Sequence, residues 1–214
     1  PADQSDFRFL QSMLEKRTEF EESVFYDVST WTMPLAFGLK HHELSRNFPM
    51  EQLERARIGQ KASGKLTISD DDIGYLIDWR DDRAAYWVNR LLEQEYLVKV
   101  ALQPLSVGDD DSRLSLDAGT CLIALGQQTK STRQMMAILQ RASADGVRVV
   151  PVNTGLTPDG IDLGSNRFAT IQPAKVATFV GDGVGAYQAG ETWHTLDTRL
   201  GIAPTMIEQS QISR

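Results

Sequence analysis

Residues 175–208 read KVATFVGDGVGAYQAGETWHTLDTRLGIAPTMIE and hold two short apolar runs on either side of a helical pattern. The first run, residues 176–180, is rich in β-branched residues and too short for a helix, so it predicts a buried strand. Gly201 and Pro204 end the helical pattern, and residues 205–207 predict the second strand. A strand, a helix and a strand in this order predict a parallel pair joined by a right-handed crossover. The apolar face of the helix consists of Ala186, Ala189, Trp193, Leu196 and Leu200.

The turn between that strand and helix is Gly181-Asp182-Gly183-Val184-Gly185. Together with Ala186 it fits the loose dinucleotide fingerprint, with Glu208 as the acid that would bind the ribose. Glu208 lies beyond the usual spacing of about 20 residues, however. Asp182 would also place a negative charge where a pyrophosphate approaches the helix. The sequence therefore favours a tight turn whose glycines allow unusual backbone angles over a cofactor site.

A similar pattern occurs earlier in the chain, where residues 73–77, 83–95 and 97–102 predict a strand, a helix and a strand. Residues 119–125 and 147–152 predict two more strands around a helix that Ser131 begins. We therefore expect an α/β fold with a largely parallel, flavodoxin-like sheet. The expected division is an N-terminal helical and extended docking segment with its linker (1–72), a first α/β segment (73–155), a connecting loop (156–174) and a second α/β segment that is cut short (175–214).

Composition narrows the classes of partner. The chain has 214 residues, a net charge of −7 and a pI near 5.0, which argues against nucleic acid or an anionic membrane as the main partner. No stretch is apolar enough to span a membrane. Cys121 is the one cysteine, so no intrachain disulfide can form. Because the chain begins at Pro1, we expect it to be a piece of a longer polypeptide, with any export signal upstream and the compartment undetermined.

The sequence contains no complete set of catalytic or metal-binding residues. The three histidines are His41, His42 and His194, and none belongs to a His-x-x-Glu or His-Glu-x-x-His motif. His194 and Asp197 are one helical turn apart but lack a third metal ligand. Cys121 lies within a predicted strand instead of on a turn, which is typical of a core residue. We therefore predict no catalytic and no metal-binding residue.

A small ligand is the alternative to a purely structural role. Parallel α/β sheets bind ligands at the carboxyl ends of their strands. On this basis the candidate ligand-binding residues are Asp78, Trp79, Asn153, Gly181, Asp182, Gly183 and Gly185.

Several phrases together resemble one family. They are residues 19–37 (EFEESVFYDVSTWTMPLAF), 153–165 (NTGLTPDGIDLGS), 180–184 (VGDGV) and 193–199 (WHTLDTR). These phrases look like the region that follows the catalytic domain in certain bacterial zinc carboxypeptidase-like proteins. In that group the following region resembles the class I glutamine amidotransferase fold. The resemblance covers most of the chain, but the zinc ligands and the cysteine that follows a strand in amidotransferases have no match.

The resemblance implies a non-catalytic accessory domain that supports or gates an upstream metallopeptidase domain of the same polypeptide. Zinc would then belong to the catalytic domain of the parent protein, and this chain would carry no cofactor. A small-ligand module for a nucleotide, sugar or amino acid, and a diverged amidotransferase-like hydrolase, are the alternatives. Exposed apolar surface on the N-terminal segment would favour a homo-oligomer.

Overall fold

The computed structural model describes residues 5–15, 33–37, 42 and 64–211. The chain divides into two compact units, Pro1–Ile58 and Gly59–Arg214. In the first unit, α1 (Phe7–Leu14) contacts α2 (Met33–Ala36). The helix α1 lies inside the helical and extended docking segment expected near the N-terminus. Most of the predicted docking segment, including residues 19–32, lies outside the described residues.

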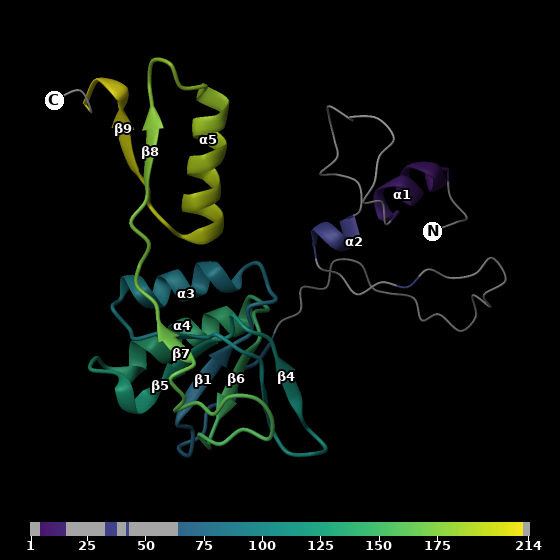
Figure 1. Ribbon diagram of the computed structural model, residues 1–214, viewed down its shortest axis with the longest axis vertical. Helices are drawn as coiled ribbons and strands as arrows, with labels where there is room; N and C mark the ends of the chain where they lie inside the picture. Colours follow the sequence, from purple (N-terminus) through teal and green to yellow (C-terminus); the bar gives the residue numbers. More distant parts are fainter. Residues whose placement is uncertain (1–4, 16–32, 38–41, 43–63, 212–214) are drawn as a thin grey trace. The chain divides into compact units, whose positions relative to one another are not determined.

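The second unit contains a five-stranded sheet in the order β6-β1-β5-β2-β7 (Figure 1). Every neighbouring pair in this sheet is antiparallel. The expectation of a largely parallel sheet with flavodoxin-like or class I glutamine amidotransferase-like connectivity is therefore wrong. The strands are β1 (Gly74–Ile77), β2 (Lys99–Ala101), β5 (Cys121–Ala124), β6 (Val149–Val152) and β7 (Phe168–Thr170).

The error concerns which strands are neighbours. The helix α3 (Ala84–Glu93) joins β1 to β2, and α4 (Thr132–Ala144) joins β5 to β6, as the sequence predicts. In each of these two strand–helix–strand segments, the two strands run in the same direction but are not neighbours. The strand β5 lies between β1 and β2, and β1 lies between β5 and β6. Two interleaved strand–helix–strand segments of this kind form the split β-α-β topology of ferredoxin-like folds. Periodicity reveals a crossover but not whether its two strands pair.

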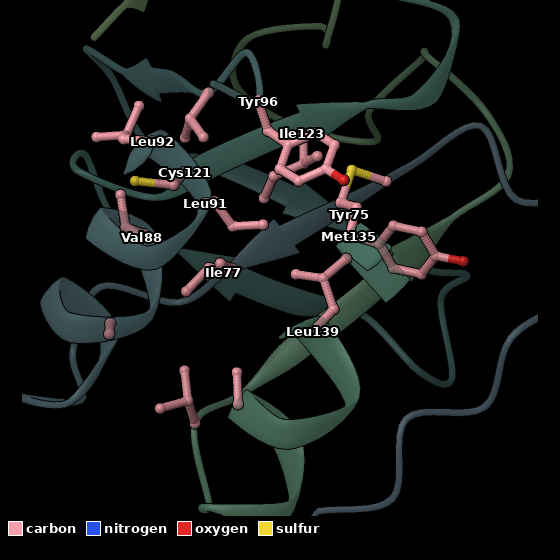
Figure 2. Close-up of a cluster of buried hydrophobic side chains, with 14 of the residues drawn as sticks. Tyr75, Ile77, Val88, Leu91, Leu92, Tyr96, Cys121, Ile123, Met135 and Leu139 are labelled. Carbon is pink, nitrogen blue, oxygen red and sulfur yellow. The ribbon is translucent and has the colours of Figure 1, made fainter. Parts of the chain in front are cut away.

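The main core lies between the sheet and the two helices, which contact each other on one of its faces (Figure 1). Because side chains alternate along a strand, β1 directs Tyr75 and Ile77 into this core and Leu76 to the opposite face. Figure 2 shows the side chains packed together. Of the labelled side chains, seven are exposed by 1% or less: Tyr75, Ile77, Leu91, Cys121, Ile123, Met135 and Leu139.

No helix of the described residues contributes to the core on the opposite face of the sheet. A hairpin of β3 (Leu105–Val107) and β4 (Leu114–Leu116) packs there with Ile161, Leu163 and Phe168. Neither hairpin strand was predicted, and β7 lies in the stretch expected to be a loop. Each of these strands has three residues and lies in a shorter apolar run than residues 97–102, which predict β2.

The last part of the second unit matches the predicted strand, helix and strand. The strand β8 (Ala177–Val180) pairs in parallel with β9 (Thr205–Glu208) through α5 (Ala186–His194) and η4 (Thr195–Arg199). However, β8 was expected to be buried, and neither strand has a buried residue. The reason is that this sheet has only two strands among the described residues. The remaining short helices are η3 (Leu125–Gln127) and η5 (Gln209–Gln211).

The core between helices and sheet should dominate stability. Replacement Leu139→Ala removes a fully buried side chain of α4, and we expect it to lower the free energy of unfolding by about 2–5 kcal/mol in urea denaturation. The matched control is Leu156→Ala, because Leu156 is 74% exposed. The control should change stability by less than about 0.5 kcal/mol. Equal effects of the two substitutions would contradict this placement of the core.

Candidate functional site

A cluster of four charged side chains lies just beyond the end of β1. Asp78 is 5% exposed, and the Arg80 guanidinium donates to both of its carboxylate oxygens, with Nε–Oδ1 at 2.9 Å and Nη2–Oδ2 at 2.6 Å. Arg148 lies 3.7 Å from the same carboxylate, and Asp117 lies 3.9 Å from Arg80. The backbone also closes over this site, because Asp78 N–H donates to the Arg148 carbonyl.

The electrostatics of this cluster keep Asp78 ionised. Burial raises the pKa of the Asp78 carboxyl, but hydrogen bonds from Arg80 and the charges of Arg80 and Arg148 more than offset burial and hold this pKa below its usual value. The carboxylate is therefore occupied by internal partners, which favours a structural role over acid–base chemistry.

A second ion-paired cluster lies at the start of α3. Arg83 donates to the Asp81 carboxylate through Nε at 3.1 Å and Nη2 at 3.0 Å, and its Nη1 donates to the Asp145 carbonyl. Trp87 Nε1 donates to the Asp145 carboxylate at 3.3 Å. These contacts link the beginning of α3 to the residue that follows α4. They explain the acidic turn after β1, whose carboxylates join elements of the fold.

Of the predicted ligand-binding residues, Asp78 and Trp79 lie apart from Asn153. Ile77 pairs with Val149, and Gly74 pairs with Val152. Since β1 and β6 are antiparallel, Asp78 and Trp79 follow one end of the pair while Asn153 follows the other, roughly 15 Å away at 3.3 Å per residue. The prediction that they share one edge assumed parallel strands. The side chain of Trp79 instead faces Gly119, where an added Cβ would lie 3.3 Å from the indole ring.

The glycine turn after β8 has the tight geometry that the sequence suggested. Gly181 and Gly183 have positive φ angles of 90° and 83°, and Val184 N–H donates to the Gly181 carbonyl at 3.1 Å. Gly185 precedes α5, and a Cβ added there would collide with the side chain of Gln188. Gln188 thus lies over the beginning of the helix, where a phosphate would have to approach.

The residues considered for catalysis lie in ordinary structural surroundings. Cys121 is 1% exposed in β5, and burial raises the pKa of its thiol to about 12, so the nucleophilic thiolate is scarce. His194 and Asp197 are both exposed, at the end of α5 and in η4. Within the described part of the chain, no three His, Cys, Asp or Glu side chains are grouped to hold a metal ion. His41 lies outside the described residues.

The structure adds an open groove that the sequence did not indicate. Its volume is about 940 Å³, which suits a small molecule. Gln128 forms part of its wall, but the amide of this side chain already bonds the Leu97 backbone and the Ala124 carbonyl. The groove is lined by Leu92, Glu95, Tyr96, Leu97, Gln127, Gln128, Thr129, Ile171, Gln172, Pro173 and Lys175.

One wall of the groove carries an unusual backbone conformation. Glu95 has a φ of 60° and is the one non-glycine residue with positive φ in the described part of the chain. It follows α3 at a position that usually holds glycine, and its neighbour Tyr96 donates its N–H to the Leu91 carbonyl. Glu95 also pairs with Lys130. No sequence signal marks this site, because glutamate is common in helices.

A different feature is the exposed apolar surface of the C-terminal segment, which we define as residues 177–208. The helix α5 has no buried residue. Four large apolar side chains of the segment are exposed: Phe179 by 54%, Tyr187 by 86%, Trp193 by 41% and Met206 by 50%. Aromatic residues and methionine are enriched at protein interfaces, so this surface is the strongest candidate for contact with another protein surface.

Comparisons of the chain with protein-family models, curated proteins and solved structures find no match. None of the described helices is long and apolar enough to cross a membrane.

The ion pair of Asp78 makes a pH-dependent contribution to stability. A depressed folded-state pKa stabilises the fold above the unfolded pKa of about 3.9, and this contribution is lost as the pH falls towards the folded pKa. We expect Asp78→Asn to lower the free energy of unfolding by about 1–3 kcal/mol at neutral pH. The difference from the unmodified chain should shrink below pH ~3.9 in urea titrations.

The control for this experiment is Asp70→Asn, which changes an exposed carboxylate in the segment before β1. It should shift stability by less than about 0.5 kcal/mol. A loss in Asp78→Asn that stays constant across the acidic range would show that the carboxylate charge is not the cause.

Proposed function

We propose that the chain is a non-catalytic accessory region of a zinc carboxypeptidase-like protein, which supports or gates the catalytic domain supplied upstream in the same polypeptide. The observation that carries this proposal is the exposed apolar surface of the C-terminal segment. Its aromatic side chains remain in contact with solvent although its strands and helix are formed. Such a surface is suited to burial against a second domain.

The polar residues support a structural role for the second unit. Asp78, Asp81, Arg80 and Arg83 form ion pairs within the unit, and burial keeps Cys121 protonated. These groups are therefore engaged in holding elements together. An amidotransferase-like hydrolase would need a reactive thiol at the end of a strand, and Cys121 lies in the core instead.

The resemblance supports the proposal through its sequence phrases. Residues 153–165 lie along the covered face of the five-stranded sheet, where Ile161 and Leu163 are buried. Residues 180–184 and 193–199 belong to the C-terminal segment. The amidotransferase-like fold expected from the same resemblance is not observed, so the proposal concerns the accessory role alone. Zinc is assigned to the parent's catalytic domain because the resemblance implies it there.

A small-ligand module is the second candidate, and the groove beside α3 is the observation that favours it. The groove combines an open volume of about 940 Å³ with the strained backbone of Glu95. Strained residues tend to occur at functional sites. In this alternative, the ligand binds in the groove, against Glu95, Tyr96 and Gln128. It does not bind at the predicted residues Asp78, Trp79 and Asn153.

The accessory role predicts binding without chemistry. The chain should contain no stoichiometric zinc and hydrolyse no carboxypeptidase substrate, but it should bind an isolated zinc carboxypeptidase-like domain from a bacterial protein that contains both segments. Calorimetric titration should show that Tyr187→Ala and Trp193→Ala each raise Kd by about tenfold or more, because exposed aromatic residues dominate interfaces.

The control variant is Leu156→Ala, which removes an exposed apolar side chain outside the C-terminal segment and should leave Kd unchanged. Zinc and hydrolysis in the chain itself would overturn the accessory role. Binding that is insensitive to both aromatic substitutions would place the contact elsewhere.

The ligand alternative predicts a different response. Nucleotides, sugars or amino acids that occupy the groove should raise the melting temperature saturably, since a ligand that binds the folded state stabilises it. Glu95→Gly should relieve the backbone strain and change the groove wall, so it should weaken this shift without lowering the melting temperature of the free chain. The absence of a shift with all three ligand classes would remove the alternative.

A further inference from the structure

The two strands of the C-terminal segment differ in the backbone hydrogen-bonding groups at their outer edges. In their parallel ladder, Ala177 pairs with Thr205 and Phe179 with Ile207, and Thr205 N–H donates to the Val176 carbonyl at 2.8 Å. This hydrogen-bonding pattern directs the backbone N–H and C=O groups of Thr205 and Ile207 towards β8. The backbone groups of Ala177 and Phe179 consequently point outward at the free edge of β8.

The outer edge of β9 is partly closed. Glu208 N–H donates to the Gln211 side chain at 3.1 Å, and Glu208 also places a charge on this edge. Charged residues and covered edges are common protections against strand pairing. The edge of β8 has neither, because residues 177–180 are uncharged and β8 has β9 as its one neighbour in the described structure.

The sequence around β8 is complementary to itself in the antiparallel direction. Lys175 precedes the strand and Asp182 follows it. If a second copy runs antiparallel, the lysine of each copy comes to the same end as the aspartate of the other. Opposite charges on paired strands favour pairing. If the two copies ran parallel, each lysine would instead lie beside the lysine of the other copy, and like charges would repel.

We propose that β8 pairs with β8 of a second copy of this chain, antiparallel and about a two-fold axis perpendicular to the sheet. The outward backbone groups fix the register. Ala177 faces Phe179 of the second copy in a hydrogen-bonded pair, and Phe179 faces its Ala177 in the same way. Thr178 then faces its own counterpart at the axis, and Thr–Thr is a favourable cross-strand pair.

The resulting sheet has four strands in the order β9-β8-β8-β9. Because the axis is perpendicular to the sheet, both copies of α5 lie on the same face. A two-stranded sheet is marginally stable in water, and doubling the strands supplies backbone partners to the groups that β8 leaves free. This association is independent of the accessory role, because it involves no other domain.

The first test is the mass of the full 214-residue chain in solution. Sedimentation equilibrium should show a concentration-dependent shift from 23.9 kDa to twice that mass. Ala177→Pro removes an outward N–H without removing a bond of the β8–β9 ladder, and it should abolish the dimer. Met206→Pro is the matched control, because it removes an outward N–H from the other edge, and it should dimerise normally.

The second test checks the register. Non-hydrogen-bonded antiparallel partners have Cα atoms about 4.5 Å apart, which a disulfide can bridge. Thr178→Cys should therefore form a covalent dimer under mild oxidation much faster than Met206→Cys, while Cys121 stays buried in both variants. A monomer at all concentrations, a dimer that survives Ala177→Pro, or equal cross-linking of the two cysteine variants would overturn the proposal.

Discussion

The insertion of β5 between β1 and β2 is the constraint on which the second unit depends. It makes β1 a central strand with β5 on one side and β6 on the other. All four residues of β1 are buried, and Gly74 allows the close approach of the Ile123 carbonyl, which would lie 2.9 Å from an added Cβ. Both faces of the sheet must then be covered. The two helices cover one face, and the β3–β4 hairpin with the loop after β6 covers the other.

The ion-paired clusters follow from this arrangement. Antiparallel pairing brings the beginning of β6 beside the end of β1, so Arg148 lies next to Asp78. The helices α3 and α4 pack together, so Arg83 at the start of one reaches Asp145 at the end of the other. Asp78 is buried just beyond the end of β1, and its charge is paired with Arg80 and Arg148. The polar residues that looked suitable for a ligand are consequently engaged in the fold.

The C-terminal segment has the opposite character. Its helix covers a sheet of two strands, and its largest side chains remain in solvent. The contrast between a five-stranded sheet with two covered faces and a two-stranded sheet with an open edge explains why both proposed interactions involve this segment. A domain could cover its aromatic residues, while the free edge of β8 is suited to another strand. The two surfaces differ chemically, one being made by side chains and the other by the backbone.

Most of the local elements could be predicted from the sequence. Apolar spacing located α3, α4 and α5 and six of the strands to within a few residues, and it correctly predicted that β8 and β9 are parallel. It placed Cys121 in the core because a cysteine inside an apolar run is buried whichever strands flank it. These properties depend on a residue and its near neighbours in the chain, which is the range that periodicity reports.

The order of the strands follows from tertiary contacts, and it sets where Asp78, Trp79 and Asn153 lie relative to one another. Whether β1 pairs with β2 or with β5 depends on contacts between residues about 45 positions apart, such as Tyr75 with Ile123, and no local pattern encodes that choice. The antiparallel result separated Asn153 from Asp78 and brought Arg148 to the latter instead. Burial is also a tertiary property. The strands β1 and β8 have similar apolar sequences, but among the described strands β1 has neighbours on both sides and β8 on one side, so β1 is buried and β8 is not.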